Sequence, residues 1–309
     1  MSNQNNLKSW LAQFRVNFLI LAVLLVLIGV ATAAMFPGSN KISILSIVLL
    51  TIGMVSAHSS VNLFNEYSDY NTGIDFNTNR SPFSGGSGML PTGKTKPAAV
   101  LNAAIITLII SAAIGIYFAI VAHWSILALS IIGGLSIVFY TPFLAKIALG
   151  ELIAGLSLGT LPVIGSYIAL TATPNQSLSE ILPNGVIWLS IAPGILTALL
   201  LFINEFPDVE ADIKGGRKHL VIIMGRKRAA LLYVIGLVAT FVSIIGCMIA
   251  GILSWWGILA LLTIPVALKA GTTALKEYNN TPKLIPALGM NVITVLATDL
   301  LLAVSIFLS

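Results

Sequence analysis

The stretch FLILAVLLVLIGVATAAMF, residues 18–36, contains no charged side chain. It is long enough for a helix to cross the hydrocarbon core of a bilayer, which needs about 20 apolar residues. The whole chain has the same character, because 57% of its 309 residues are hydrophobic and only 9% are charged. Soluble domains carry about 25% charged residues. The composition therefore excludes an ordinary soluble protein and predicts an integral membrane protein.

Similar apolar runs recur along the chain, and they are continuous, which predicts helices and not the alternating strands of a barrel. Nine runs reach or approach spanning length: 18–36, 42–64, 98–122, 125–143, 148–172, 186–205, 229–251, 255–270 and 284–308. The first run is not followed by a small-residue cleavage site, so we expect a retained anchor helix and not a signal peptide. The predicted fold is an all-α integral membrane protein with nine transmembrane helices.

The basic residues predict the orientation of these helices. If the N-terminus is cytoplasmic and nine spans alternate, fifteen of the sixteen Lys and Arg lie on the cytoplasmic side and only Lys41 lies outside. A wrong number of spans would mix the two sides. We therefore expect a cytoplasmic N-terminus, a C-terminus on the opposite side, and the long loops 65–97 and 206–228 at the cytoplasmic face.

The basic, cysteine and histidine residues argue against several other classes of binding site. The basic residues fall in short loops between apolar runs, which does not suggest a nucleic-acid partner. The single cysteine, Cys247, excludes an intrachain disulfide and a metal site built from cysteines. The histidines His58, His123 and His219 share no metal-ligand spacing, although His219 is close enough in sequence to an acidic cluster to touch a phosphate.

Two similar motifs, NEYSD at 65–69 and NEFPD at 204–208, stand where the two long loops begin. Seven of the eleven acidic residues lie in these regions: Glu66, Asp69, Asp75, Glu205, Asp208, Glu210 and Asp212. Helical residues four apart share a face, so the spacing predicts that the Asn and Asp of each motif point the same way. Gly73 is expected to end the first helix and to leave Asp75 in the loop.

Carboxylates this close together repel one another unless a cation lies between them. Carboxylate and amide oxygens are the ligands that suit Mg²⁺, which completes its shell with water and substrate phosphate. The predicted metal ligands are Asn65, Asp69, Asp75, Asn204, Asp208 and Asp212. Arg80 follows the first cluster, and Lys214 and Arg217 follow the second. Acids that hold Mg²⁺ and bases that hold phosphate oxygens together predict a diphosphate site.

Two other classes of function are compatible with acidic loops. A cation transporter or channel could use them as an entry vestibule, but transport sites usually lie near the bilayer midplane, where Asp299 is the strongest acidic candidate. A membrane phosphotransferase that acts on alcohols would use the same metal and diphosphate chemistry. Asp299 and Glu151, at the start of the fifth run, are acids within apolar runs and are therefore functional candidates.

Beyond this reasoning, the chain resembles the UbiA superfamily of intramembrane prenyltransferases. The resemblance rests on NLFNEYSDYNTGID at 62–75, YTPFLAKIALGELIAG at 140–155 and NEFPDVEADIKGGRKHL at 204–220. SPFSGGSGMLPTG at 81–93 and GELIAGLSLGTLPVIGSYIA at 150–169 are most similar to the branch that prenylates 1,4-dihydroxy-2-naphthoate in menaquinone synthesis. The resemblance covers nearly the whole chain and implies a single membrane-embedded prenyltransferase domain, residues 1–309.

The resemblance implies that the chain uses Mg²⁺ to transfer an isoprenoid from a polyprenyl diphosphate to an aromatic acceptor. It assigns catalysis to Asp69, Asp75, Asp208, Asp212 and Tyr140, and diphosphate binding to Arg15, Arg80, Lys146 and Lys214. Arg217, which follows the second acidic cluster, completes the predicted diphosphate-binding set. Tyr67, Phe139 and Tyr140 are candidates to stabilise an allylic cation.

The chain departs from the family's commoner Asn-Asp pairs at Glu66 and Glu205, which leaves open which carboxylates bind the metal directly. The acceptor is open as well. 1,4-Dihydroxy-2-naphthoate leads, and 4-hydroxybenzoate, a tetrapyrrole and a glycerol phosphate are the alternatives. The prenyl chain length, the oligomeric state and the catalytic base do not follow from the sequence.

Overall fold

A computed structural model describes residues 2–38, 42–140 and 143–309, so Lys41 and Pro142 lie outside the described residues. In these three ranges all regular secondary structure is helical, which confirms the predicted all-α class. The α-helices are α1 Ser2–Gln13, α2 Val16–Met35, α3 Ile44–Thr72, α4 Ile74–Asn77, α5 Pro97–Val121, α6 Ser125–Phe139, α7 Gly150–Gly155, α8 Leu161–Thr171, α9 Leu178–Ile181, α10 Asn184–Asn204, α11 Val209–Lys214, α12 Leu220–Met224, α13 Arg226–Ile249, α14 Ile258–Leu261, α15 Ile264–Glu277 and α16 Thr281–Phe307. Three short helices of other types are η1 Leu144–Lys146, η2 Leu156–Thr160 and η3 Trp255–Gly257.

Eight helical segments of the described chain are long and apolar enough to cross a membrane. They are α2, α3, α5, α10, α13 and α16, together with the composite segments Gly150–Thr171 and Trp255–Glu277. The predicted run 125–143 forms the shorter apolar helix α6, of 15 residues. It ends at Phe139, and the next helix, η1, begins at Leu144.

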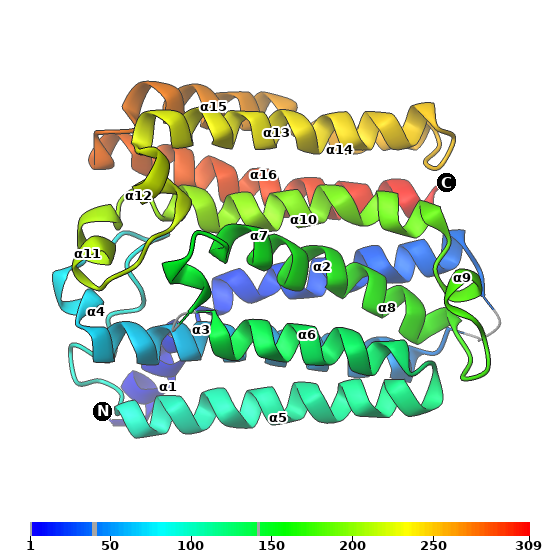
Figure 1. Cartoon of the computed structure of the whole chain (residues 1–309), viewed down its shortest axis with the longest axis horizontal. Helices are drawn as coiled ribbons and strands as arrows, with labels where there is room; N and C mark the ends of the chain where they lie inside the picture. Colours follow the sequence, from blue (N-terminus) through cyan, green and yellow to red (C-terminus); the bar gives the residue numbers. More distant parts are fainter. Residues whose placement is uncertain (1, 39–41, 141–142) are drawn as a thin grey trace.

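The long helices lie side by side, with their ends gathered at two faces of the molecule (Figure 1). The N-terminus and α1 lie at the same end as α4, α11 and α12, on the left of the view. The C-terminus and α9 lie at the opposite end. The two loops that carry the acidic motifs therefore meet at one end of the helix bundle.

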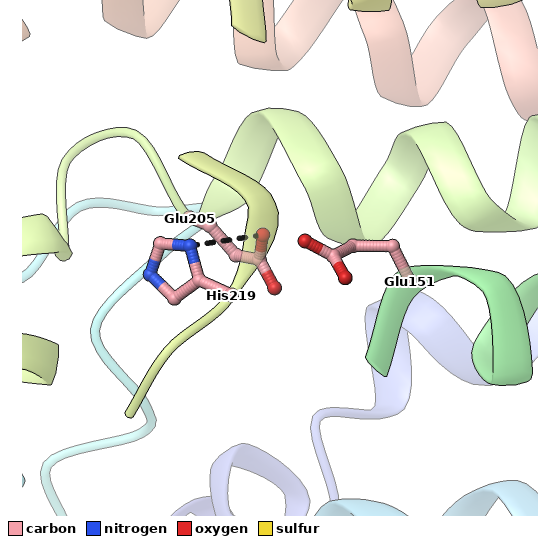
Figure 2. Close-up of side chains that lie close together, drawn as sticks. All are labelled: Glu151, Glu205 and His219. Atoms are coloured by element: carbon pink, nitrogen blue, oxygen red, sulfur yellow. Dashed lines mark ion pairs between the residues drawn. The ribbon is translucent and has the colours of Figure 1, made fainter. Parts of the chain in front are cut away.

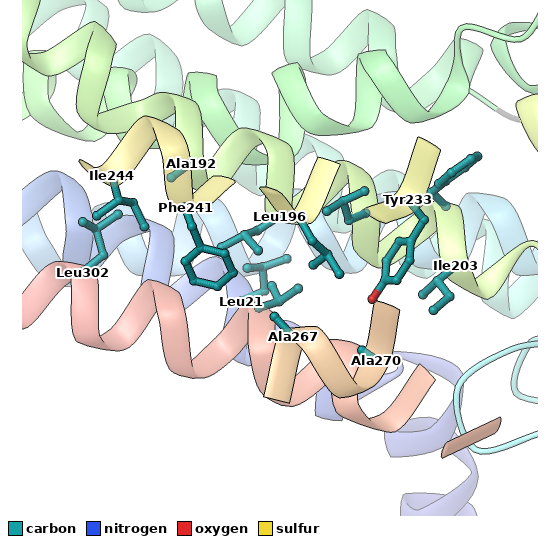
Figure 3. Packing of buried hydrophobic residues seen from close by; sticks show 14 of the residues in the cluster. Leu21, Ala192, Leu196, Ile203, Tyr233, Phe241, Ile244, Ala267, Ala270 and Leu302 are labelled. Carbon is teal, nitrogen blue, oxygen red and sulfur yellow. The ribbon is translucent and has the colours of Figure 1, made fainter. Parts of the chain in front are cut away.

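Helix α2 joins the two halves of the core. One hydrophobic cluster packs α2 against α10, α13, α15 and α16, and Figure 3 shows part of it, with Leu21, Leu196, Phe241 and Leu302 facing one another. A second cluster packs α2 against α3, α5, α6 and α8. Because both clusters share α2, the helices form one continuous core and the two acidic motifs are held in a fixed relation.

A close crossing of small residues places the start of α7 beside the end of α10. A Cβ atom added at Gly159 would lie 2.8 Å from the Cα of Gly194, so glycine is required for this approach. The crossing lies on η2, a π-helical turn that precedes Pro162 at the start of α8. Small residues at such crossings let helix backbones approach closely in membranes.

The ends of the two motif-bearing helices differ from the predicted pattern. Helix α3 ends before Gly73, which has φ of 79°, as expected, but Asp75 lies in the short helix α4 and not in a loop. Asn204 is the last residue of α10, and Asp208 precedes α11. The expected shared helix face is therefore wrong for Asn204 and Asp208. Pro207 has no backbone N–H with which to continue the helix.

Candidate active site

The first acidic motif supplies three buried or partly buried oxygen-bearing side chains. Asn65 and Asp69 lie one turn apart near the end of α3, and Asp75 lies in α4 after the left-handed turn at Gly73. All three side chains line one cavity. The turn at Gly73 therefore brings Asp75 back toward the side chains that precede it.

The second motif lines the same cavity from the other half of the molecule. Asn204 and Glu205 come from the end of α10, and Asp208 and Asp212 come from α11 and the turn before it. Although helix α10 ends within this motif, the turn that follows reverses the chain, and all four side chains line the same cavity. The six predicted metal ligands thus lie around a single cavity.

Arg217 connects the two motifs. Its guanidinium donates to the Asn65 Oδ1 atom over 2.9 Å and forms an ion pair with Asp69, both from the first motif. It also donates to Asp212 Oδ1 of the second motif over 3.2 Å. The neighbouring carboxylates raise the pKa of Arg217 even though burial opposes its charge. A cationic side chain therefore occupies the space between the acidic clusters.

The segment 81–93, between α4 and α5, closes over the cavity and is bound by both motifs. The backbone N–H of Gly85 donates to Asp208 Oδ2 over 3.1 Å, and the N–H of Ser87 donates to Glu66 Oε1 over 2.7 Å. A Cβ atom at Gly86 would lie 3.0 Å from Asp75 Oδ1, and Gly86 has φ of 69°, so a side chain there would crowd the acids.

Glu66 is fully engaged as an anchor for this segment. Its carboxylate accepts from the Ser87 N–H, from the Ser87 hydroxyl at 2.6 Å and from the Gln13 side chain at 2.9 Å. Gln13 in turn accepts a hydrogen bond from the Thr95 hydroxyl. Sequence reasoning did not single out Gln13 or Ser87. The glycine-rich stretch around Ser87 was the only signal that the segment must lie close to other groups.

Several oxygens that face the cavity have no hydrogen-bond partner among the described residues: Asp75 Oδ2, Asn204 Oδ1 and Asp208 Oδ1. Burial, together with the carboxylate of Glu66, raises the pKa of Asp75 to about 7. Burial, together with the carboxylate of Asp212, raises the pKa of Asp208 to about 7. Unpaired buried oxygens are costly, and a hard divalent cation is the group that such a donor set fits.

The predicted basic residues fall into two groups. Arg15 and Arg217 line the cavity, and Arg15 donates to the Phe83 carbonyl over 3.5 Å. Arg15 has φ of 53°, a strained value for a side-chain-bearing residue, at the turn between α1 and α2. Three others, Arg80, Lys146 and Lys214, are exposed and do not line the cavity.

Of the aromatic and intramembrane acidic candidates, some line the cavity and others lie away from it. Tyr140 lines the cavity, whereas Tyr67 packs against the hydrophobic cluster around Leu63, and Phe139 is 49% exposed. Asp299 is fully buried in α16, and neither of its carboxylate oxygens has a hydrogen-bond partner among the described residues. The assignments of these residues to catalysis remain predictions.

Two further cavities continue from the polar one into the helix bundle. The second shares Arg15, Asn65, Tyr140 and Asn204 with the first. The third is mainly apolar, lies between α3, α5, α6 and η2, and meets the second at His58 and Leu158. His58 lies in the wall that the second and third cavities share, and no sequence spacing indicated this position.

Comparisons with known proteins agree with this arrangement. The sequence profile described as the UbiA prenyltransferase family matches residues 18–291. The 1,4-dihydroxy-2-naphthoate octaprenyltransferase of Bacillus subtilis (strain 168) is 28% identical over 254 residues, 79% of this chain and 75% of the relative. The protein of the same name from Escherichia coli (strain K12) is 28% identical over 312 residues, 98% of this chain and 96% of the relative.

Solved structures share the fold at low sequence identity. The apo structure of a UbiA homolog from Aeropyrum pernix K1 matches with a TM-score of 0.70 and 17% identity, over 90% of this chain and 94% of that one. A UbiA homolog from Archaeoglobus fulgidus bound to DMAPP and Mg²⁺ matches with a TM-score of 0.58 and 17% identity, over 96% of this chain and 99% of that one.

Proposed function

We propose, from the premise that this chain belongs to the UbiA prenyltransferase family, that it transfers a polyprenyl chain from its diphosphate to 1,4-dihydroxy-2-naphthoate in menaquinone synthesis. As a member of that family, the chain is a prenyltransferase and an integral multi-pass membrane protein. The names of the two bacterial relatives support the choice of acceptor.

One observation carries the proposal: oxygens from two distant acidic motifs converge on one cavity, and Asp75, Asn204 and Asp208 each have an oxygen without a hydrogen-bond partner in the described part of the chain. We assign Asn65, Asp69 and Asp75, with Asn204, Asp208 and Asp212, to the binding of Mg²⁺. The Archaeoglobus structure, which holds DMAPP and Mg²⁺, supports this assignment. When bound, Mg²⁺ would supply positive charge to the departing diphosphate.

The chain's own residues bind and orient the diphosphate. Arg15 and Arg217 line the cavity and present guanidinium groups, which bind phosphate oxygens in a bidentate manner. The segment 81–93 covers the same space and keeps free water from an allylic cation, which water would otherwise capture. Tyr140 lines both the first and the second cavity, so we assign it to the place where the bond between the isoprenoid and the diphosphate breaks. The exposed basic residues Arg80, Lys146 and Lys214 attract the diphosphate toward the cavity by their charge.

The two inner cavities divide the remaining substrate groups by polarity. The second cavity is lined by Arg15 and by two buried polar atoms, His58 Nε2 and Thr197 Oγ1, that have no hydrogen-bond partner within residues 2–38, 42–140 and 143–309. It therefore suits the hydroxyl and carboxylate groups of an aromatic acceptor. The third cavity is lined mostly by apolar side chains and suits the isoprenoid. The acceptor ring therefore lies between the diphosphate site and the chain-binding cavity.

We also propose the finer topology of the chain. Helix α6 counts as a ninth span beside the eight long segments, which fits the position of the two termini at opposite ends of the bundle (Figure 1). The positive-inside rule then gives a cytoplasmic N-terminus. Residues 1–309 form one membrane-embedded domain, and the loops 65–97 and 206–228 act at the cytoplasmic face.

A membrane assay tests the reaction. Purified protein in lipid is supplied with Mg²⁺, octaprenyl diphosphate and either 1,4-dihydroxy-2-naphthoate, 4-hydroxybenzoate, a tetrapyrrole or a glycerol phosphate, and prenylated product is measured by mass spectrometry. Product with the naphthoate alone, lost on addition of a chelator, is the expected result. Product with another acceptor would overturn the assigned acceptor and keep the prenyl transfer.

A pair of variants tests the metal assignment. Asp208→Asn removes one charge from the cavity and should lower the transfer rate by at least about 100-fold, because it removes stabilisation of the departing charge. Glu210→Gln is the matched control, because Glu210 lies two residues further on with an exposed side chain that pairs with Arg226. Near-normal turnover of Asp208→Asn would contradict the assignment.

A further inference from the structure

A second cluster of possible metal ligands lies at the edge of the cavity, which Glu205 and His219 also line. Figure 2 shows Glu151 from the start of α7, Glu205 from the end of α10, and His219 from the loop before α12, with their side chains directed toward one another. Their exposed fractions are 3%, 8% and 2%. One ligand atom from each residue lies within 4.8 Å of the other two. The cluster therefore joins three segments that are distant in the sequence.

The hydrogen bonds around the cluster do not satisfy all of its polar atoms. Glu151 Oε1 accepts from the backbone N–H of Leu220 over 2.7 Å, but Glu151 Oε2 and Glu205 Oε2 have no hydrogen-bond partner among the described residues. His219 Nδ1 lies 3.4 Å from Glu205 Oε2 and Nε2 lies 3.2 Å from Asp212 Oδ2, and neither contact has hydrogen-bond geometry. A buried polar atom without a partner destabilises the fold, so a group that satisfies these atoms would be favoured here.

The carboxylates of this cluster outnumber the positive charges that could balance them. The carboxylates of Glu151, Glu205 and Asp212 surround a single imidazole, and the nearby Arg217 is engaged by Asp69 and Asp212. The buried carboxylates of Glu151 and Glu205 lie close enough to repel one another. A proton shared by the two glutamates and a metal ion bound between them are the two ways to remove this repulsion.

We propose that Glu151, Glu205 and His219 bind a divalent transition-metal ion of the Mn²⁺ and Zn²⁺ class, separately from the Mg²⁺ that the two acidic motifs hold. One imidazole with two carboxylates is a donor set that suits such ions, whereas Mg²⁺ is bound mainly by oxygen. Bonds of about 2.0–2.2 Å require the ligand atoms to lie about 3–4 Å apart. A small contraction from the observed spacing provides that geometry.

Such an ion would hold in place the side chains that line the diphosphate site. Glu205 adjoins Asn204, and His219 lies two residues after Arg217, so the ion would connect the end of α10 to the loop that carries the guanidinium. Glu151 and its hydrogen bond to Leu220 tie α7 to the same loop. The inference does not require the prenyl transfer or its acceptor to be as proposed above.

Metal retention is the direct test. The full-length protein in detergent is stripped with a chelator, incubated with Mn²⁺ or Zn²⁺ in a large excess of Mg²⁺, and desalted into Mg²⁺ buffer. Bound metal is then counted by mass spectrometry, and Mn²⁺ also by electron paramagnetic resonance. We expect about one tightly held ion per chain in the wild type, and a loss of most of it in Glu151→Gln and in His219→Gln.

Three control variants make the result specific. Asp69→Asn, in the first acidic motif, and Glu180→Gln, an exposed glutamate, should both retain the ion. His219→Cys should restore Zn²⁺ binding, because a thiolate also ligates Zn²⁺, and it shows that His219→Gln acts through ligation and not through misfolding. The inference is overturned if the wild type retains no ion, or if Glu151→Gln and His219→Gln retain as much as the wild type. A protonated-carboxyl infrared band that disappears in Glu205→Gln would then identify the shared proton.

Discussion

Glu66 and Glu205 stand at the same place in two similar pentapeptides, yet they have different surroundings. Glu66 accepts three hydrogen bonds and anchors the segment 81–93, whereas Glu205 retains an oxygen without a hydrogen-bond partner among the described residues. Sequence reasoning could not separate them, because the difference depends on Gln13, Glu151 and His219, which are distant in the chain. It did identify the six metal-ligand candidates, because repeated acids in an apolar chain are conspicuous.

The role of Glu66 leads to a testable expectation. In Glu66→Gln, an amide replaces a carboxylate that accepts from Gln13 and Ser87, so at least one charge-assisted hydrogen bond is lost at about 1.5–3 kcal/mol. We expect a lower melting temperature in detergent and faster protease cleavage within residues 81–93. Glu180→Gln, at an exposed position, is the control and should change neither. Unchanged melting and cleavage in Glu66→Gln would show that the segment is held by other contacts.

Arg217 leads to a second expectation at this scale. Arg217→Ala removes the cation that pairs with Asp69 and Asp212, and the loss of one partner from a buried ion pair costs about 3–5 kcal/mol. We expect the metal-free variant to melt at a lower temperature than the metal-free wild type. Added Mg²⁺ should raise the melting temperature of Arg217→Ala by more than that of the wild type.

A partly exposed arginine outside the cavity serves as the control for this test. Arg226→Ala removes an arginine that pairs with the exposed Glu210 and donates to the Phe206 carbonyl, outside the cavity. Its melting temperature should respond to Mg²⁺ as the wild type does. An equal response to Mg²⁺ in the wild type and in Arg217→Ala would show that Arg217 and the metal do not share a site.

At the scale of helices, the long apolar runs were predicted well because membrane-spanning segments must satisfy their own backbone hydrogen bonds. The errors lie at the ends. The run 125–143 contains a helix that ends at Phe139, and NEFPD breaks the helix that its Asn-Asp spacing favoured. At NEFPD, Pro207 and the turn before α11 decide where the helix ends, and hydrophobic periodicity does not report such an end. The composite segment with η2 likewise depends on a close crossing with Gly194 on another helix.

Helix α6 offers a test of the apolar cavity. Gly134 lines this cavity, and a Cβ atom there would meet no other heavy atom within 4 Å. In Gly134→Leu the new side chain should therefore fill the cavity without distorting the helix. If the cavity holds the isoprenoid, kcat/KM should fall by about tenfold or more for octaprenyl diphosphate and little for geranyl diphosphate.

Gly246→Leu is the matched control for this substitution. Gly246 lies in α13, is exposed, and would also meet no heavy atom within 4 Å. It should leave the preference for chain length unchanged. Equal losses with both diphosphates in Gly134→Leu would indicate that the isoprenoid lies elsewhere.

For the whole molecule, the composition and the basic residues predicted a membrane protein whose two acidic loops act together at one face. The structure brings these loops to one end of the bundle (Figure 1). The position of α2 between the two halves of the core could not be predicted from the sequence. An apolar helix face can be buried equally well in lipid or against another helix, so its sequence carries little information about which helices it contacts. The orientation in the membrane is still a prediction.

Cysteine labelling tests that orientation. The native cysteine, Cys247, is buried and should react little with the label, so single cysteines can be introduced at exposed positions. With a membrane-impermeant maleimide, Ser309→Cys should react in intact cells, whereas Lys8→Cys and Lys94→Cys should react only after lysis. The opposite pattern would invert the topology, and labelling of Lys8→Cys and Ser309→Cys from the same side would imply an even number of spans.

The apolar cavity between α3, α5, α6 and η2 also affects how this enzyme's kinetics are expressed. Its proposed occupant dissolves in the bilayer and not in water, so the enzyme meets this substrate within a two-dimensional solvent. The relevant concentration is then the mole fraction of the isoprenoid among the lipids. Inert phospholipid added to the same bilayer acts as a diluent, whereas more buffer around the vesicles does not.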